Sequence, residues 1–188
     1  MNVNAGESYT PTSKFLHWVG ALCFIAALLL GIYFWTLVEG VPEDSKSFFK
    51  WIPWHKSLGF TVFLLLLARI PWRWLNPPPP LPDTMAPWER TASHIVHYLL
   101  YAMMVAIPLS GWLGSALGHY TFNFLGLIPM PNVPEKNAEL ANWIYDYIHI
   151  PLAWAAAALL FVHVGAALKH HFITRDAVLT RMLPGKGS

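Results

Sequence analysis

The sequence predicts an all-α membrane protein, a single domain over residues 1–188 that folds as a bundle of four transmembrane helices. Hydrophobic residues make up 55% of the chain and charged residues only 12%. Four mainly apolar stretches each reach roughly twenty or more residues, the length that crosses a bilayer. Because unpaired backbone groups are too costly in lipid, each stretch must be a helix. The predicted helices cover residues 15–38, 55–75, 91–117 and 145–171.

The first predicted helix is expected to stay in the membrane and not to be removed as a signal peptide. It is too long and too rich in tryptophan for a signal peptide, and no small-residue cleavage site follows Phe34 and Trp35. Cys23 lies in its middle and is the only cysteine of the chain, so no internal disulfide can form. We expect this thiol to be a small core residue.

Prolines shape the two connectors that flank the third predicted helix. Residues 77–80 are four consecutive prolines and Pro82 follows, which predicts a short, stiff polyproline segment between the second and third helices. Residues 119–142 contain Gly126 and several prolines. This composition predicts a long connector that holds at most one small surface element.

The distribution of basic residues predicts that both termini are cytoplasmic. Eight of the twelve Lys and Arg side chains fall on the side of the termini. They are Lys14, Arg69, Arg73, Arg90, Lys169, Arg175, Arg181 and Lys186. Cytoplasmic loops of membrane proteins carry the excess of basic residues, so this side is assigned to the cytoplasm. The net charge of +2 is too small to indicate nucleic-acid binding.

Four histidines lie near the ends of the predicted helices and are the main candidates for a functional site. His149 and His163 are fourteen residues apart on one helix, about 3.9 turns and roughly 21 Å along its axis. They therefore share a face near opposite membrane surfaces. In the predicted topology His17 lies at the depth of His163, and His55 lies at the depth of His149.

Two histidine pairs at two depths are explained by a haem between the members of each pair. Neutral imidazole is a strong iron ligand, and the interior of a helix bundle is a usual cofactor site. Gly20, Gly59 and Gly165 follow three of these histidines by two to four residues and would let a flat macrocycle approach, although small residues also serve helix packing.

Two other interpretations of the histidines remain open. Any single histidine can be a hydrogen-bonded residue of the bundle or of the membrane interface. A non-haem, His-rich metal transporter is the other alternative. It is weakened because no Asp or Glu lies inside a predicted helix to offset a divalent charge, and Asp146 is only at an entrance.

Short motifs at the helix starts carry a family resemblance. Residues 15–18 read Phe-Leu-His-Trp, residues 55–59 read His-Lys-Ser-Leu-Gly, and residues 94–97 read His-Ile-Val-His. The end of the chain adds Lys-His-His-Phe at 169–172 and Arg-Asp at 175–176. This combination resembles the bacterial cytochrome b561 family over nearly the whole chain.

The resemblance implies a multi-pass cytochrome of the bacterial inner membrane with two haem b groups. It implies that His17 and His163 ligate the haem on the cytoplasmic side, and that His55 and His149 ligate the haem on the periplasmic side. It also implies exchange of electrons with ubiquinone. One branch of the family oxidises superoxide at the periplasmic side, which predicts a superoxide:ubiquinone oxidoreductase. The alternative is a quinol-linked cytochrome b that shuttles electrons for a separate redox partner.

Four further residues are candidates for contacts with a cofactor. His94 and His97 lie on one helical face near the cytoplasmic surface, and we expect them to hydrogen-bond a haem propionate or a quinone oxygen. Arg69 lies fourteen residues after His55 and could pair with a propionate, and Lys169 could play a similar part. Interface polarity and snorkelling are the competing explanations for these residues, and His119 is expected to be an interface residue.

Overall fold

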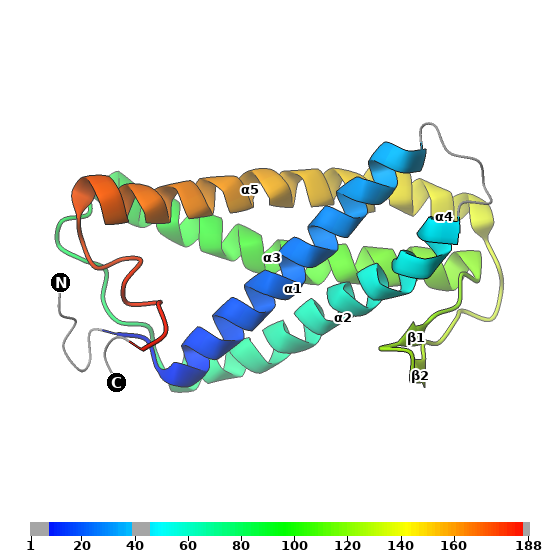
Figure 1. Cartoon of the computed structure of the whole chain (residues 1–188), viewed down its shortest axis with the longest axis horizontal. Helices are drawn as coiled ribbons and strands as arrows, with labels where there is room; N and C mark the ends of the chain where they lie inside the picture. The colour runs from blue at the N-terminus through cyan, green and yellow to red at the C-terminus, as the bar shows by residue number, and fades with distance from the viewer. Residues whose placement is uncertain (1–7, 39–45, 186–188) are drawn as a thin grey trace.

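The computed structural model describes residues 8–38 and 46–185 and is mostly helical (Figure 1). In chain order the elements are α1 (Pro11–Val38), α2 (Lys46–Leu75), α3 (Pro87–Gly118), β1 (Asn123–Phe124), β2 (Ile128–Pro129), α4 (Ala138–Ile144), η1 (Tyr145–His149), α5 (Ile150–Lys169) and η2 (His170–Thr174). Within these described residues, four helical segments are long and apolar enough to cross a membrane. The predicted four-helix membrane fold is therefore confirmed.

The helices begin earlier in the sequence than the apolar stretches indicate, because polar residues outside those stretches cap them. Thr10 accepts a hydrogen bond at its hydroxyl from the backbone N–H of Ser13 (3.2 Å), so α1 begins at Pro11. Before α3, the N–H of Ala86 donates to the carboxylate of Glu89 (2.9 Å). The predicted starts at residues 15 and 91 are thus each four residues late.

The last membrane span is one continuous helical run over Ala138–Thr174 with a π-helical turn on each side of α5. Asn137 caps its start by accepting a hydrogen bond from the N–H of Leu140 (2.9 Å). The run therefore begins seven residues before the predicted residue 145. One π turn, η1, ends at His149, and such turns are frequent at functional sites.

The two proline-rich connectors adopt different structures. Residues 77–82 form neither helix nor strand, as the polyproline prediction requires. The connector after α3 holds one small antiparallel hairpin, β1 and β2, in which Phe124 pairs with Ile128. The N–H of Leu125 in the hairpin turn donates to the hydroxyl of Ser57 on α2 (3.1 Å), which fastens the hairpin to the bundle.

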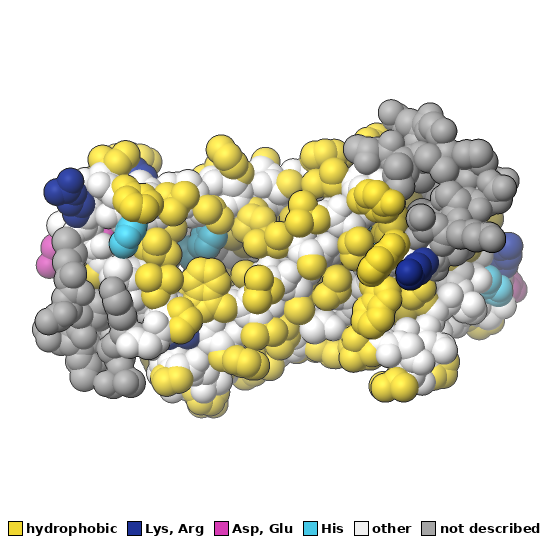
Figure 2. Space-filling model, in the orientation of Figure 1, with side chains coloured by type: hydrophobic (Ala, Val, Ile, Leu, Met, Phe, Trp, Pro, Cys, Tyr) yellow, Lys and Arg dark blue, Asp and Glu magenta, His cyan; other side chains and the backbone are white. Residues whose placement is uncertain are grey.

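The core of the bundle is a thin layer to which α1, α2, α3 and α5 each contribute one buried residue: Phe24, Val62, Ile107 and Ala156. Three of these lie seven residues, about two helical turns, from the candidate histidines, because Phe24 follows His17, Val62 follows His55, and Ala156 is midway between His149 and His163. The layer therefore separates the two levels at which the histidines lie. On the face shown in Figure 2, hydrophobic side chains also cover much of the surface along the middle of the bundle.

The C-terminal segment, residues 175–185, folds back across the end of the bundle at which the described chain begins. The carbonyl of Arg181 accepts a hydrogen bond from the N–H of Tyr9 (3.4 Å), and the carbonyl of Met182 accepts one from the indole N–H of Trp18 (2.8 Å). The Arg181 guanidinium donates to the carbonyl of Pro80 in the polyproline segment (2.6 Å). This segment ties together three parts of the chain that are distant in sequence.

A buried hydrogen-bonded pair, His170 and Asp176, anchors the C-terminal segment, and we expect its removal to loosen that end of the bundle. His170 Nδ1 and Asp176 Oδ2 are 2.6 Å apart, with side chains only 5% and 4% exposed. Replacing Asp176 by alanine leaves His170 without its carboxylate and should cost about 3 kcal/mol. The melting temperature in detergent should fall by about 5–10 °C. Asp83→Ala is the matched control, because Asp83 is fully exposed beside Arg90, and an unchanged melting temperature in Asp176→Ala would contradict the prediction.

Candidate haem-binding sites

The structure brings the four candidate histidines together as two pairs. His17 on α1 faces His163 on α5 with 6.2 Å between the ring centroids. His55 on α2 faces His149 at the end of η1, also with 6.2 Å between the ring centroids. These are the same pairs that the predicted depths give, one on each side of the core layer.

The spacing of the rings fits an iron ion between the members of each pair. Two imidazoles bound on opposite sides of one metal at roughly 2 Å each leave their ring centroids about 6 Å apart. Both pairs have this separation, and each draws its two rings from different helical segments. Among the described residues, no group of three or more His, Cys, Asp or Glu is arranged to hold a metal ion.

The orientation of His55 and His149 is fixed by backbone carbonyls. Nδ1 of His55 donates a hydrogen bond to the carbonyl of Ala27 (2.9 Å), and Nδ1 of His149 donates to the carbonyl of Ile107 (3.0 Å). A carbonyl can only accept, so Nδ1 carries the proton in both rings and Nε2 is left with its lone pair. This is the tautomer that binds a metal, and the outer hydrogen bond strengthens the ligand.

Two glycines that sequence reasoning missed make these hydrogen bonds sterically accessible. Gly31 lies four residues after Ala27, and Gly111 lies four residues after Ile107. In a helix the side chain four residues later covers a given carbonyl, so glycine there leaves the carbonyl open. A Cβ built on Gly111 would lie 2.8 Å from Cε1 of His149, and one on Gly31 would lie 3.3 Å from Cε1 of His55.

The glycines predicted from the sequence to let a macrocycle approach, Gly20, Gly59 and Gly165, have a different environment. No heavy atom lies within 4 Å of a Cβ built on Gly20, Gly59 or Gly165, apart from those of the adjoining backbone. The protein therefore leaves space beside the histidines at these positions. Such open space on helices that carry paired imidazoles fits a flat macrocycle.

The remaining candidates lie mostly around the His17–His163 pair. The ring of His97 is 5.2 Å from that of His163, centroid to centroid, and its Nδ1 donates to the carbonyl of Ser93 (2.6 Å). Nη2 of Arg69 is 3.2 Å from Nδ1 of His17. His94 is exposed on α3.

Lys169, a candidate for a cofactor contact, and His119, expected at the membrane interface, have partners at the ends of the bundle. Lys169 pairs with Glu89 in the first turn of α3 and lies 5.7 Å from the ring centroid of Trp88. Nε2 of His119 donates to the carbonyl of Val133 in the connector after α3 (3.0 Å). Both contacts are local to the ends of the bundle.

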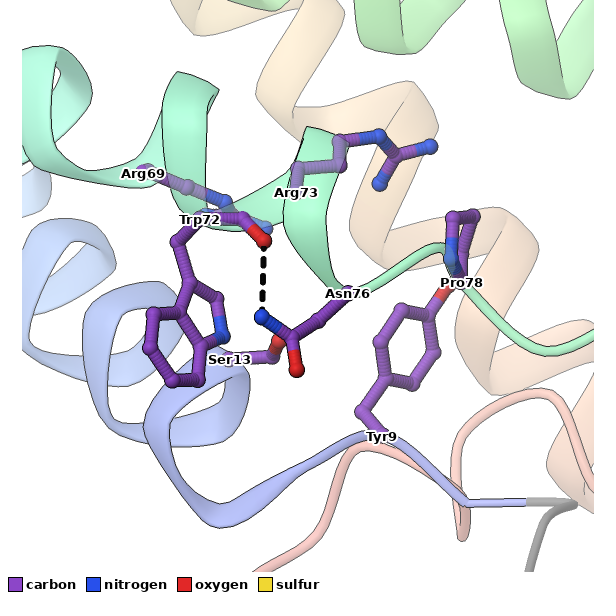
Figure 3. A pocket seen from close by; sticks show the side chains of 7 residues that line it. All are labelled: Tyr9, Ser13, Arg69, Trp72, Arg73, Asn76 and Pro78. Atoms are coloured by element: carbon purple, nitrogen blue, oxygen red, sulfur yellow. Dashed lines mark hydrogen bonds between the residues drawn. The ribbon is translucent and has the colours of Figure 1, made fainter.

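Arg69 connects the His17–His163 pair to a small pocket at the same end of the bundle (Figure 3). The pocket is lined by Tyr9, Ser13, Arg69, Trp72, Arg73, Asn76 and Pro78. The Arg69 guanidinium also lies 5.6 Å from the ring centroid of Tyr101, whose buried hydroxyl has no hydrogen-bond partner in the described part of the chain. The positive charge of Arg69 and the unpartnered hydroxyl of Tyr101 are suited to bind the propionate carboxylates of a haem at this histidine pair.

The four-helix membrane fold and the two histidine pairs fit the class of membrane-embedded b-type cytochromes. The family model for prokaryotic cytochrome b561 matches residues 8–185. The chain belongs to this family. Membership implies haem b binding and membrane electron transfer in a bacterial, multi-pass protein.

Curated relatives of similar length agree with this assignment. The chain is 34% identical to Cytochrome b561 homolog 2 of Escherichia coli (strain K12), over 98% of this chain and 95% of the relative. It is 29% identical to Probable superoxide oxidase CybB of Yersinia pestis, over 96% and 98%. It is 31% identical to Cytochrome b561 homolog 1 of Escherichia coli (strain K12), over 94% and 97%. No solved structure matches the chain significantly.

Proposed function

We propose that this protein binds two haem b groups, one between His17 and His163 and one between His55 and His149, and carries electrons between the two ends of the bundle. The observation that carries the proposal is the equal 6.2 Å separation of the rings in both pairs. Bound haem supplies reversible one-electron chemistry at each pair.

The histidine pairs determine whether a substrate binds the metal or exchanges electrons with it from a distance. A haem iron held by the two imidazoles of a pair would supply electron transfer and would leave no position at which a substrate could bind the metal. Substrates therefore exchange electrons with the sites from outside and do not bind to the metal. Nδ1 hydrogen bonds hold the rings of His55 and His149, and the core layer around Phe24 keeps the two sites apart.

We further propose superoxide as the electron donor and ubiquinone as the acceptor, with superoxide oxidised at the periplasmic side. The support is the similarity to a protein named a probable superoxide oxidase, at 29% identity over nearly the full length of both chains. The excess of Lys and Arg on the side of the termini supports a cytoplasmic location for both termini. The His55–His149 pair would then lie toward the periplasm.

The decisive experiment mixes pulses of superoxide with the purified holoprotein and ubiquinone. We expect superoxide to disappear near the diffusion limit and quinol to form in step with it. The matched control is His149→Ala, which should lose this activity. Consumption no faster than in the control would reject the superoxide assignment and favour a cytochrome that shuttles electrons for a separate redox protein. Absence of reduced b-type haem bands in the wild-type protein would reject haem binding itself.

A further inference from the structure

The two histidine pairs differ in the charge that their Nδ1 atoms face. At the His55–His149 pair both Nδ1 atoms donate to carbonyl oxygens, which carry partial negative charge. Ser110 adds a second oxygen 3.1 Å from Nδ1 of His149. At the His17–His163 pair, Nδ1 of His17 faces a guanidinium nitrogen of Arg69 at 3.2 Å. A His17 ring that ligates iron through Nε2 carries its proton on Nδ1, so the guanidinium, which is always positively charged, acts on that ring through its charge and not as a hydrogen-bond donor.

Acidic side chains at the His17 end do not offset this charge, as far as the described residues show. Glu89 pairs with Lys169, and Asp176 pairs with the buried His170. Arg73 lies one turn after Arg69 on the same helix and adds positive charge at that end.

At the His55 end of its membrane span α2 carries Lys50, which lies over the ring of Trp51, and Lys56, which is directed toward the hairpin. Lys56 donates to the carbonyl of Tyr120 (3.0 Å) and lies 5.2 Å from the ring centroid of Phe122. Its ammonium is therefore held by the connector after α3, whereas Arg69 touches an imidazole of a histidine pair directly.

We infer that Arg69 raises the reduction potential of the iron site at His17–His163 above that of the site at His55–His149, and so sets the direction of electron flow. Reduction adds one negative charge to an iron site, and a nearby positive charge stabilises the reduced form. Hydrogen bonds from Nδ1 to carbonyls make the imidazoles stronger donors, which stabilises the oxidised form. One electron then moves downhill from ferrous iron at His55–His149 to ferric iron at His17–His163, and no atom is transferred.

This inference rests on the proposed function, and a redox titration of the purified holoprotein tests it. The optical spectrum of the wild-type protein should titrate in two steps, which His149→Ala and His163→Ala assign to the two sites. At a fixed solution potential, Arg69→Gln should lower the ratio of reduced to oxidised haem at the His17–His163 site by on the order of tenfold. It should leave the potential of the other step unchanged. Arg69→Lys should retain most of the wild-type value, because the charge is kept.

Matched variants separate this effect from a general disturbance. Arg90→Gln removes an arginine that pairs with the exposed Asp83 and should shift neither step. Ser110→Ala removes an acceptor near His149 and should raise the potential of the His55–His149 step alone, which tests the inference even where Arg69→Gln fails to bind haem.

Three outcomes would overturn the inference while haem binding stands. They are a lower potential at His17–His163 than at His55–His149, an Arg69→Gln variant that moves both steps equally or neither, and a Ser110→Ala variant with no shift. A wild-type protein that shows no b-type bands would instead reject the proposed function.

Discussion

Replacing His149 by alanine is expected to remove one haem of two and to leave the other in place. Alanine cannot ligate iron, and the facing His55 alone cannot supply both axial ligands of the site. The core layer separates the pairs, so the His17–His163 site should keep its haem. His163→Ala should produce the converse loss. Haem content per protein, with the potential of the haem that remains, measures both effects.

His94 and His97 provide the controls for this experiment. His94 is exposed, and the ring of His97 lies 5.2 Å from that of His163, closer than two imidazoles on one iron allow. We expect His94→Ala and His97→Ala to retain both haems. If His97→Ala loses a haem and His17→Ala does not, the assignment of His17 as the partner of His163 is wrong.

Replacing Gly111 by alanine is expected to cost most of the haem at the His55–His149 site, although Gly111 ligates nothing. Its new Cβ would lie 2.8 Å from Cε1 and 3.1 Å from Nδ1 of His149, so the ring would have to leave the carbonyl of Ile107. Gly31→Ala should have a milder effect, because its Cβ would lie 3.3 Å from Cε1 of His55. Haem content of the two variants measures this order.

Gly114→Ala is the matched control for Gly111→Ala. It lies on the same helix, and its Cβ would also meet a ring at 2.8 Å, but that ring belongs to Tyr145. We expect Gly114→Ala to lower the melting temperature with a smaller loss of haem. Equal haem loss in the two variants would mean that crowding of α3 against the last span, and not displacement of His149, is responsible.

The histidine pairs could be predicted from sequence because depth in a membrane is a one-dimensional quantity. Helix order and the fourteen-residue spacing fix which histidines are at the same depth, and the histidines at the same depth are also the ones whose rings lie close together. Lateral contacts do not follow from depth. The carbonyls of Ala27 and Ile107, and the glycines that expose them, depend on how the helices are rotated, and apolar residues around a lipid-exposed helix carry little information on rotation.

Hydropathy also could not predict where the helices begin or how the C-terminal segment is held. Thr10, Glu89 and Asn137 begin their helices through side-chain hydrogen bonds outside the apolar stretches. The C-terminal segment is held by Asp176 and by backbone groups that meet only in the folded chain. Polar residues near a membrane surface have several ordinary roles, so their sequence alone does not distinguish a cap from an anchor.

The thin layer of Phe24, Val62, Ile107 and Ala156 has a consequence for energy conversion under the proposed function. An electron that passes this layer moves through roughly 21 Å of a hydrocarbon core about 30 Å thick, a region without water. The electric field across the membrane therefore acts on it, with up to about 2.3 kcal/mol per 100 mV for a full crossing. The rate and extent of electron transfer between the two ends would therefore depend on the membrane voltage. The bundle would couple its redox chemistry to the displacement of charge across the membrane.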